Sequence, residues 1–224
     1  MGSVHRRAAK TALYDRLATV GKAVASGRRA ELVDVLAQGE RSVEDLAQEI
    51  DQSVANTSQH LQVLARAGLV TSRRDRNRIL YRLAGADVEE LWHAMRAVAR
   101  SHVDGIDRLA AAYLGAHHEL EELSREELAR RLGDDSVVVW DVRPEVEFAA
   151  GHLPGAVSVP PGEVLRRLRE APAEVEVVAY CRGPFCVYAD DAVRELRRSG
   201  RNARRLEDGF PEWRRAGLPV EVGG

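Results

Sequence analysis

Long apolar segments are missing from this 224-residue sequence. No apolar run approaches the roughly 18 residues that a membrane-spanning helix needs, and no signal-peptide core follows Met1. Internal repeats and low-complexity tracts are missing too, and the 45% hydrophobic and 30% charged content is that of a globular protein. We therefore expect a cytoplasmic protein without a membrane partner.

Cysteine is scarce. Both cysteines of the chain, Cys181 and Cys186, fall in one short stretch. So few thiols in a cytosolic protein argue against a fold that disulfides hold together. Two small buried hydrophobic residues would be the simplest interpretation, but the position of the pair, described below, favours a reactive role.

The chain divides into two regions of different pattern. Residues 1–118 carry a formal charge of +3 and residues 119–224 one of −5, so the first region is better suited to an anionic polymer. Before a polar, acidic joint at 117–122 the apolar spacing is mostly helical, and after it buried strands alternate with helices. We predict two domains, 1–116 and 117–224.

The first domain is predicted to be mainly α-helical with one β-hairpin. Ser42 and Ser53 have the chemistry of helix caps, and Gly39 and Gly68 are typical helix ends. The order helix, helix, turn, helix, hairpin predicts a winged helix-turn-helix. Its expected elements are helices over 8–25, 28–38, 54–67 and 86–114, a short helix after Ser42, and strands over 69–72 and 79–83 with a polar turn between them.

Two polar surfaces of this domain suit a double-stranded DNA operator. The helix over 54–67 is expected to bury Val54, Leu61, Leu64 and Ala65. Its outer face would present short hydrogen-bonding groups to the major groove, namely Asn56, Thr57, Ser58, Gln59 and His60. The hairpin would present cations to the phosphate backbone or minor groove, namely Arg73, Arg74, Arg76 and Arg78. The alternative is a solvated charge run on an ordinary hairpin, which the preceding helices disfavour.

The first domain resembles the arsenic-repressor (ArsR/SmtB) family. The similarity is carried by residues 42–47, 58–64 and 67–70 (SVEDLA, SQHLQVL and AGLV) within the region 28–83. The resemblance implies a symmetric homodimer that reads a pseudo-palindromic operator and is released by an inducer. The helices over 8–25 and 86–114 would correspond to the helices that form the dimer in that family.

Metal sensing by this domain is not expected. Many members of the family bind metals through cysteines in the helix-turn-helix, and this half has none. Others use acidic and histidine ligands on the last helix, where His102, Asp104, His117 and His118 make a zinc site across the dimer conceivable. The order at 102–104 is His-x-Asp rather than the Asp-x-His of that family. Surface histidines are therefore the favoured interpretation, and we predict neither a metal site nor a cofactor.

The second domain is predicted to be α/β with a parallel sheet. Residues 137–140 and 175–180 read as buried strands, each followed by a loop and a helical pattern. Ser124 with Glu127 predicts a capped helix that runs through Leu132.

The second strand leads into a loop that is suited to a reactive thiol. Cys181 stands at its start, and the remaining loop residues are Arg182, Gly183, Pro184, Phe185, Cys186 and Val187. Backbone N–H groups that converge on such a loop, ahead of a helix over 188–199, favour a thiolate nucleophile. Sulfur transfer, phosphate-ester hydrolysis and arsenate reduction all fit a thiolate in this setting. A phosphatase loop of the Cys-x5-Arg type would need arginine where Val187 stands, so phosphatase chemistry is disfavoured.

The second domain resembles the rhodanese (sulfurtransferase) family over about residues 119–220. The matching segments are 141–143 (DVR), 147–148 (EF), 151–156 (GHLPGA), 180–183 (YCRG) and 206–213 (LEDGFPEW). The resemblance implies that Cys181 accepts sulfane sulfur as a persulfide from a donor such as thiosulfate, polysulfide or another persulfide. It also implies that Asp141 and Arg143 form a structural pair that supports the loop.

Two residues depart from an efficient thiosulfate sulfurtransferase. Phe185 stands where a polar or cationic residue would better bind a dianion. Cys186 is either a small buried residue or a resolving thiol that attacks the persulfide. We favour a repressor whose DNA affinity changes when sulfur is loaded at Cys181. The alternatives are a DNA-tethered sulfurtransferase, a repressor that responds to arsenite or another thiophilic ion, and an inert rhodanese fold used for protein contact.

Overall fold

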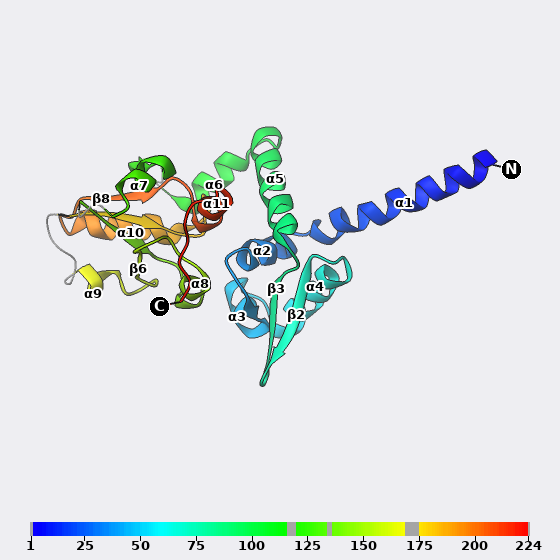
Figure 1. Cartoon of the computed structure of the whole chain (residues 1–224), viewed down its shortest axis with the longest axis horizontal. Helices are drawn as coiled ribbons and strands as arrows, with labels where there is room; N and C mark the ends of the chain where they lie inside the picture. Colours follow the sequence, from blue (N-terminus) through cyan, green and yellow to red (C-terminus); the bar gives the residue numbers. More distant parts are fainter. Residues whose placement is uncertain (1, 116–119, 134–135, 169–174, 224) are drawn as a thin grey trace. The chain divides into compact units, whose positions relative to one another are not determined.

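The computed structural model describes residues 2–115, 120–133, 136–168 and 175–223 (Figure 1). The chain forms two compact units, Met1–Ser101 and His102–Gly224. The units divide ahead of the predicted domain boundary at 116/117. Within the described residues, no helix is both long and apolar enough to cross a membrane.

The first unit is a winged helix-turn-helix. Its core is a single cluster to which the first helices and both hairpin strands contribute, with Leu32, Leu46, Leu61 and Leu64 fully buried. The three strands form an antiparallel sheet in the order β1-β3-β2. The elements are α1 (Gly2–Val24), α2 (Gly27–Leu36), β1 (Arg41–Ser42), α3 (Val43–Glu49), α4 (Val54–Arg66), β2 (Val70–Asp75), β3 (Arg78–Leu83) and α5 (Ala86–His102).

Both predicted serine caps are confirmed. The Ser42 hydroxyl accepts a hydrogen bond from the backbone N–H of Asp45 at 3.1 Å, which begins α3. The Ser53 hydroxyl accepts from the N–H of Asn56 at 3.2 Å, which begins α4. Each hydroxyl satisfies one of the backbone donors that a helix N-terminus leaves unpaired. These two caps fix where α3 and α4 start.

Two predictions for this region are wrong in detail, and one strand was not predicted. The polar turn of the hairpin is shorter than 73–78, because Asp75 pairs with Arg78 and leaves only two residues between the strands. The two-residue strand β1, which pairs with β3, was not predicted. The long helix over 86–114 is instead two helices, α5 and α6 (Ile106–Leu114), separated at Gly105. Gly105 has a φ of 81°, a left-handed conformation that interrupts a right-handed helix and that glycine adopts without steric cost.

The second unit is the predicted α/β domain with a parallel sheet. Its five strands pair in the order β4-β8-β7-β5-β6, and every pair is parallel. After α6 the elements are β4 (Glu122–Leu123), α7 (Arg125–Arg131), β5 (Val137–Asp141), α8 (Glu145–Ala150), β6 (Val157–Ser158), α9 (Val164–Leu168), β7 (Glu176–Tyr180), α10 (Val187–Arg198), β8 (Ala203–Leu206) and α11 (Phe210–Arg215).

The central strand β7 is buried on both faces and carries the cysteine loop at its end. Val177 and Ala179 pack with α10 on one face, whereas Val178 and Tyr180 pack with α7 and α11 on the other. Side chains alternate between the two faces of a strand. Cys181, which directly follows Tyr180, accordingly belongs to the cluster on the α10 side. The alternation explains why the loop begins beside the N-terminus of α10.

Candidate functional site

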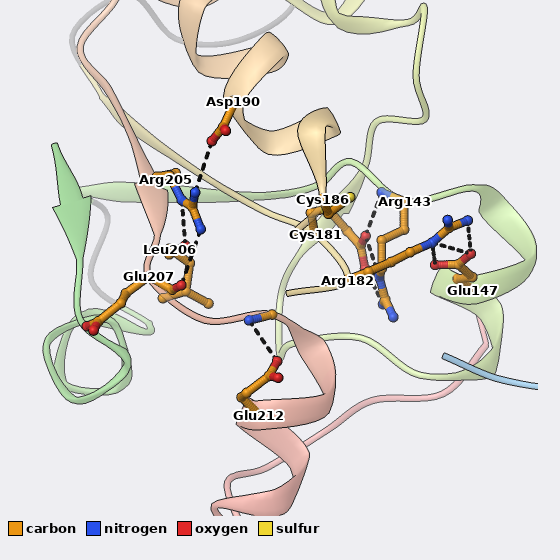
Figure 2. Close-up of a disulfide and its surroundings, with 12 residues drawn as sticks. Arg143, Glu147, Cys181, Arg182, Cys186, Asp190, Arg205, Leu206, Glu207 and Glu212 are labelled. Carbon is orange, nitrogen blue, oxygen red and sulfur yellow. Dashed lines mark hydrogen bonds and ion pairs between the residues drawn. A yellow bond between two sulfur atoms is a disulfide. The ribbon is translucent and has the colours of Figure 1, made fainter. Parts of the chain in front are cut away.

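The two cysteines are joined within the loop between β7 and α10. Cys181 is 2% exposed, and Cys186 is half-buried at the N-cap of α10. Their sulfur atoms form a disulfide, with the Cα atoms 6.3 Å apart (Figure 2). The sequence left open whether Cys186 pairs with Cys181, and in the structure it does. Because the cysteines are 5 positions apart, the bond joins two ends of one loop rather than distant elements of the fold.

The loop rests on the start of α11, where the backbones approach each other closely. The N–H of Phe210 donates a hydrogen bond to the Cys181 carbonyl at 3.0 Å, and the N–H of Cys186 donates to the Gly183 carbonyl at 3.1 Å. A Cβ atom added at Gly209 would lie 2.5 Å from the Gly183 Cα, so any larger residue at 209 would displace the loop. The segment 206–213, which carried part of the rhodanese resemblance, is therefore the floor of the cysteine loop.

Arg182 points away from the sulfur atoms toward Glu147 in α8 (Figure 2). Its Nε lies 2.9 and 3.0 Å from the two carboxylate oxygens, and its Nη2 lies 2.5 Å from Oε1. Arg182 is 9% exposed and Glu147 is fully buried. The guanidinium also lies 5.5 Å from the centre of the Tyr188 ring. Arg182 thus anchors the loop to α8, a direction that the sequence did not give.

Asp141 and Arg143 form a buried ion pair next to Tyr180, which directly precedes Cys181. The Arg143 Nη2 lies 2.5 Å from Asp141 Oδ2 and donates to the Gly151 carbonyl at 2.7 Å, and both side chains are fully buried. Burial opposes the charge of Arg143, but the hydrogen bonds and charge of Asp141 outweigh it and raise the Arg143 pKa. The Tyr180 hydroxyl donates to the same carboxylate, and burial followed by the Asp141 charge raises the pKa of Tyr180. The network connects the pair to Tyr180, which directly precedes Cys181, and the supporting role of the pair stays a prediction.

The rest of the loop is apolar and uncharged. From Gly183 to Val187 the chain has no charged side chain, and Pro184, Phe185 and Val187 are half-buried. Val187 is the first residue of α10, so its position matches the predicted start of the helix to within one residue. Residues 183–187 therefore offer no cation to a sulfur-containing dianion such as thiosulfate.

The predicted DNA-contacting face of α4 is only partly exposed. Asn56 and Gln59 are exposed, and Ser58 and His60 are half-buried. The prediction for Thr57 is wrong, because Thr57 is fully buried. Thr57 lies one turn before Leu61 and two turns before Leu64, so it shares their inner face.

The predicted burial of two other α4 residues is also wrong. Val54 is 45% exposed, and Ala65 is exposed. Val54 is the first residue of α4 and lies one turn ahead of the buried stripe, so it reaches past the end of the core. The buried face of α4 therefore consists of Thr57, Leu61 and Leu64.

The four arginines of the hairpin are not equivalent. Arg73 lies in β2 and is held by Glu40, with 2.9 Å between Nε and Oε1 and 2.5 Å between Nη2 and Oε2. Arg74 also lies in β2, and Arg78 begins β3. Arg76 is exposed in the turn with a left-handed φ of 52°. No pattern in the sequence pointed to Glu40 as the partner of Arg73, because the two-residue strand next to it has no detectable periodicity.

Within the described residues, the candidate metal ligands do not form a cluster. His102 ends α5 and Asp104 follows it, and both are exposed. His117 and His118 lie outside the described residues. No group of three or more potential metal-ligating side chains occurs within the parts of the chain that the structure describes.

Comparisons with known proteins match each unit to a different family. The family model for the bacterial regulatory protein, arsR family, matches residues 26–72, and that for the rhodanese-like domain matches residues 124–216. The HTH-type transcriptional regulator Rv0324 of Mycobacterium tuberculosis is 46% identical over 214 residues, covering 96% of this chain and 94% of the relative. A sulfurtransferase of Allochromatium vinosum is 33% identical over 102 residues, covering 45% of this chain and 94% of the relative.

A solved structure also resembles the first unit. The solution structure of the homodimeric winged helix-turn-helix DNA-binding domain of Mb0332 from Mycobacterium bovis is 45% identical, with a TM-score of 0.41. The match covers 42% of this chain and 88% of the Mb0332 domain. The family models and the relative that spans nearly the whole chain confirm both resemblances predicted from the sequence.

Proposed function

Because the chain belongs to the HTH-type transcriptional regulators that join an arsR-family helix-turn-helix to a rhodanese-like domain, we propose that it is a repressor that senses reactive sulfur through Cys181. The observation that carries this proposal is the disulfide between Cys181 and Cys186 within the rhodanese loop. Two cysteines that reach each other in one loop can take up sulfur and release it again, and in doing so change the loop.

The chemistry needs two thiol–disulfide exchanges. The Cys181 thiolate attacks the outer sulfur of a persulfide donor, R–S–SH. The sulfur–sulfur bond of the donor breaks, RS⁻ leaves with the electron pair, and Cys181 becomes a persulfide. The Cys186 thiolate then attacks the Cys181 Sγ, so that HS⁻ leaves and the disulfide forms. A cellular dithiol or two monothiols would supply the two electrons that return the disulfide to two thiols and would themselves become a disulfide.

The loop suits a switch better than a high-turnover enzyme. Cys181 is 2% exposed, and the disulfide withdraws it from further attack until a reductant acts. The loop has no charged side chain between Gly183 and Val187 to bind a dianion, and Arg182 is engaged by Glu147. Each uptake of sulfur would therefore end in a closed loop instead of the next catalytic cycle.

On the DNA side we assign the contacts to the accessible residues of α4 and the hairpin. Base and phosphate contacts from α4 would come from Asn56, Ser58, Gln59 and His60. Phosphate or minor-groove contacts from the hairpin would come chiefly from Arg74, Arg76 and Arg78. A homodimer would cover the apolar side chains that α1 exposes in the single chain, where Leu13, Tyr14 and Leu17 are 58%, 59% and 61% exposed.

The experiment is a measurement of operator affinity in defined sulfur states. Reduced protein first selects a duplex from a random DNA library, and its Kd for that duplex is then measured by fluorescence anisotropy before and after polysulfide treatment. We expect polysulfide to weaken binding by a factor within the roughly 5–150-fold range of allosteric couplings. Cys181→Ser should keep the reduced-state Kd and lose the response.

Two results would contradict the proposal. One is an unchanged Kd in polysulfide-treated wild-type protein whose disulfide or persulfide is confirmed by mass spectrometry. The other is a full response in Cys181→Ser. The second candidate is a DNA-tethered sulfurtransferase, which is favoured by the match of the second unit to a sulfurtransferase. It would be supported if the Kd for DNA does not change while thiosulfate or polysulfide is consumed with many turnovers.

A further inference from the structure

Helix α10 begins at the cysteine loop and contacts the chain on both sides of the segment 115–120. We propose that α10 transmits the sulfur state of Cys181 and Cys186 to α6 and β4, and that Arg194 is the positioning residue for this link. The inference rests on the proposed function, because it describes how the same cysteines would act on the rest of the chain.

The first contact joins α10 to the end of α6. The Nη2 of Arg194 donates a hydrogen bond to the carbonyl oxygen of Leu114 at 3.3 Å. Leu114 is the last residue of α6 and is 5% exposed. The final carbonyls of a helix lack partners within the helix and carry its partial negative charge, so a guanidinium there is favourable. Because α6 is the first helix of the second unit after the division at Ser101, its position sets where the chain enters this unit.

The second contact joins α10 to β8 through a buried ion pair, and β8 in turn pairs with β4. Asp190 of α10 is fully buried, and its Oδ1 lies 3.1 Å from Nη1 of Arg205, which is 2% exposed (Figure 2). The Nε of Arg205 lies 3.5 Å from Oε1 of Glu122 in β4. Arg197 of α10 contacts the residue before β4 directly, with 3.7 Å between its Nη2 and Oε2 of Glu121. The chain is therefore held by α10 before residue 115 and again from residue 121 onward.

The geometry of α10 ties these contacts to the cysteine pair. Cys186 is the N-cap of α10, and Asp190 and Arg194 follow it at successive intervals of four residues. Residues four apart lie on the same side of a helix. A shift at the Cys186 end of α10 would therefore act first on Asp190 and, one turn later, on Arg194.

The sulfur state changes the space available at that end of the helix. In the disulfide, the Cα atoms of Cys181 and Cys186 are held 6.3 Å apart. A persulfide on Cys181 adds one sulfur atom at a side chain that is 2% exposed and belongs to a packed cluster with α10. A packed core does not accept an extra atom without movement of its neighbours. Cys186 is half-buried, so the start of α10 is the side on which the loop can yield.

The test compares two arginines of α10 that differ in what they hold. Arg194→Ala removes the donor to Leu114. Arg198→Ala is the matched control, because it removes the same charge from the same helix at a side chain that is 73% exposed and paired with Glu195 on α10 itself. For each full-length variant, the Kd for the selected operator is measured reduced and after polysulfide, with the sulfur state determined by mass spectrometry.

We expect Arg194→Ala to bind the operator with the wild-type Kd when reduced and to form the disulfide or persulfide normally. The ratio of treated to reduced Kd should fall toward one, whereas Arg198→Ala should keep the wild-type ratio. Glu122→Gln, at a 44% exposed side chain facing Arg205, should reduce the ratio in the same direction without disturbing the buried pair.

The outcomes separate this inference from the proposed function. A wild-type response that survives in both Arg194→Ala and Glu122→Gln would overturn the role of α10 and leave sulfur sensing intact. An equal loss in Arg198→Ala would also overturn it, since the effect would then follow charge alone. A wild-type protein that does not respond to polysulfide would contradict the proposed function, and this inference would fall with it.

Discussion

The hairpin of the first unit and the cysteine loop of the second are both short connections bordered by charged residues, but they use charge in different ways. The hairpin presents Arg74, Arg76 and Arg78 on exposed positions. Around the cysteine loop, the ion pairs of Asp141 with Arg143 and of Glu147 with Arg182 are buried. An exposed cation is available to a partner, whereas a buried pair fixes the geometry of its neighbours and cannot leave without a large cost.

The sharpest test of this difference is a buried arginine against an exposed one in the same unit. Arg143→Ala leaves the Asp141 carboxylate buried without its cation, which is expected to lower the free energy of unfolding by about 3–5 kcal/mol. Arg166→Ala removes the exposed partner of Glu163. The Arg166 and Glu163 side chains are 60% and 40% exposed, so this change should lower the free energy of unfolding by less than about 1 kcal/mol.

The two costs are compared by urea denaturation of the full chain, followed by tryptophan fluorescence. Trp140 and Trp213 are buried in the second unit and report its unfolding. Because Asp141 and Arg143 contact Tyr180, which directly precedes Cys181, Arg143→Ala should also change the rate at which Cys181 reacts with a thiol reagent. Equal destabilisation by the two substitutions would show that burial does not distinguish these pairs.

The second prediction divides the arginines of the hairpin itself. Binding to DNA weakens as salt increases, so the slope of log K against log salt is negative. Arg76→Asn removes an exposed charge with a residue that tolerates the left-handed φ of 52°, and it should reduce the magnitude of this slope by about one for each protomer bound. Glu40→Gln releases Arg73 from its carboxylate and should increase the magnitude of the slope, because Arg73 could then face a phosphate.

Operator titrations at several salt concentrations measure these slopes. Arg166→Ala, in the other unit, serves as the control for a general change in net charge. A Glu40→Gln protein with the wild-type slope would mean that Arg73 holds the hairpin in place without competing for DNA, and an unchanged slope in Arg76→Asn would remove the turn from the interface.

The features that were predicted correctly depend on residues close together in the sequence. Ser42 and Ser53 cap helices that begin at the next residue, and the cap needs only a hydroxyl three positions before the donor. The cysteine loop was placed correctly for a similar reason, because a buried strand, a Gly/Pro loop and a helical pattern follow one another. The parallel sheet also followed from strands that alternate with helices.

The features that were missed depend on contacts between distant residues. The Glu40–Arg73 pair joins positions 33 apart, and the Arg182–Glu147 pair joins positions 35 apart. No local pattern indicates which partner a surface arginine selects. Thr57 was misplaced because its polar side chain suggested an outer face, whereas its spacing from Leu61 puts it inward; periodicity was the better guide there than residue type.

The smallest expected effect concerns Glu176, a carboxylate at the start of β7 that accepts hydrogen bonds from Arg204 and lies 2.7 Å from Arg131. The Arg204 hydrogen bond lowers the Glu176 pKa below its usual value of 4.5, although burial opposes the shift. A carboxyl with a lower pKa in the folded state stabilises the fold above the unfolded pKa, and this contribution disappears as the pH falls through the folded value.

Glu176→Gln should therefore be less stable than wild type at pH 7, with a difference in the free energy of unfolding that is constant down to about pH 5 and shrinks at lower pH. Glu163→Gln, at the exposed pair with Arg166, is the matched control and should show a smaller difference at pH 7. Urea denaturation at pH 7, 5, 4 and 3 follows this difference. A difference that stays constant through the range would show that the ion pairs of Glu176 contribute no pH-dependent stability, even though the Glu176 side chain is only 9% exposed.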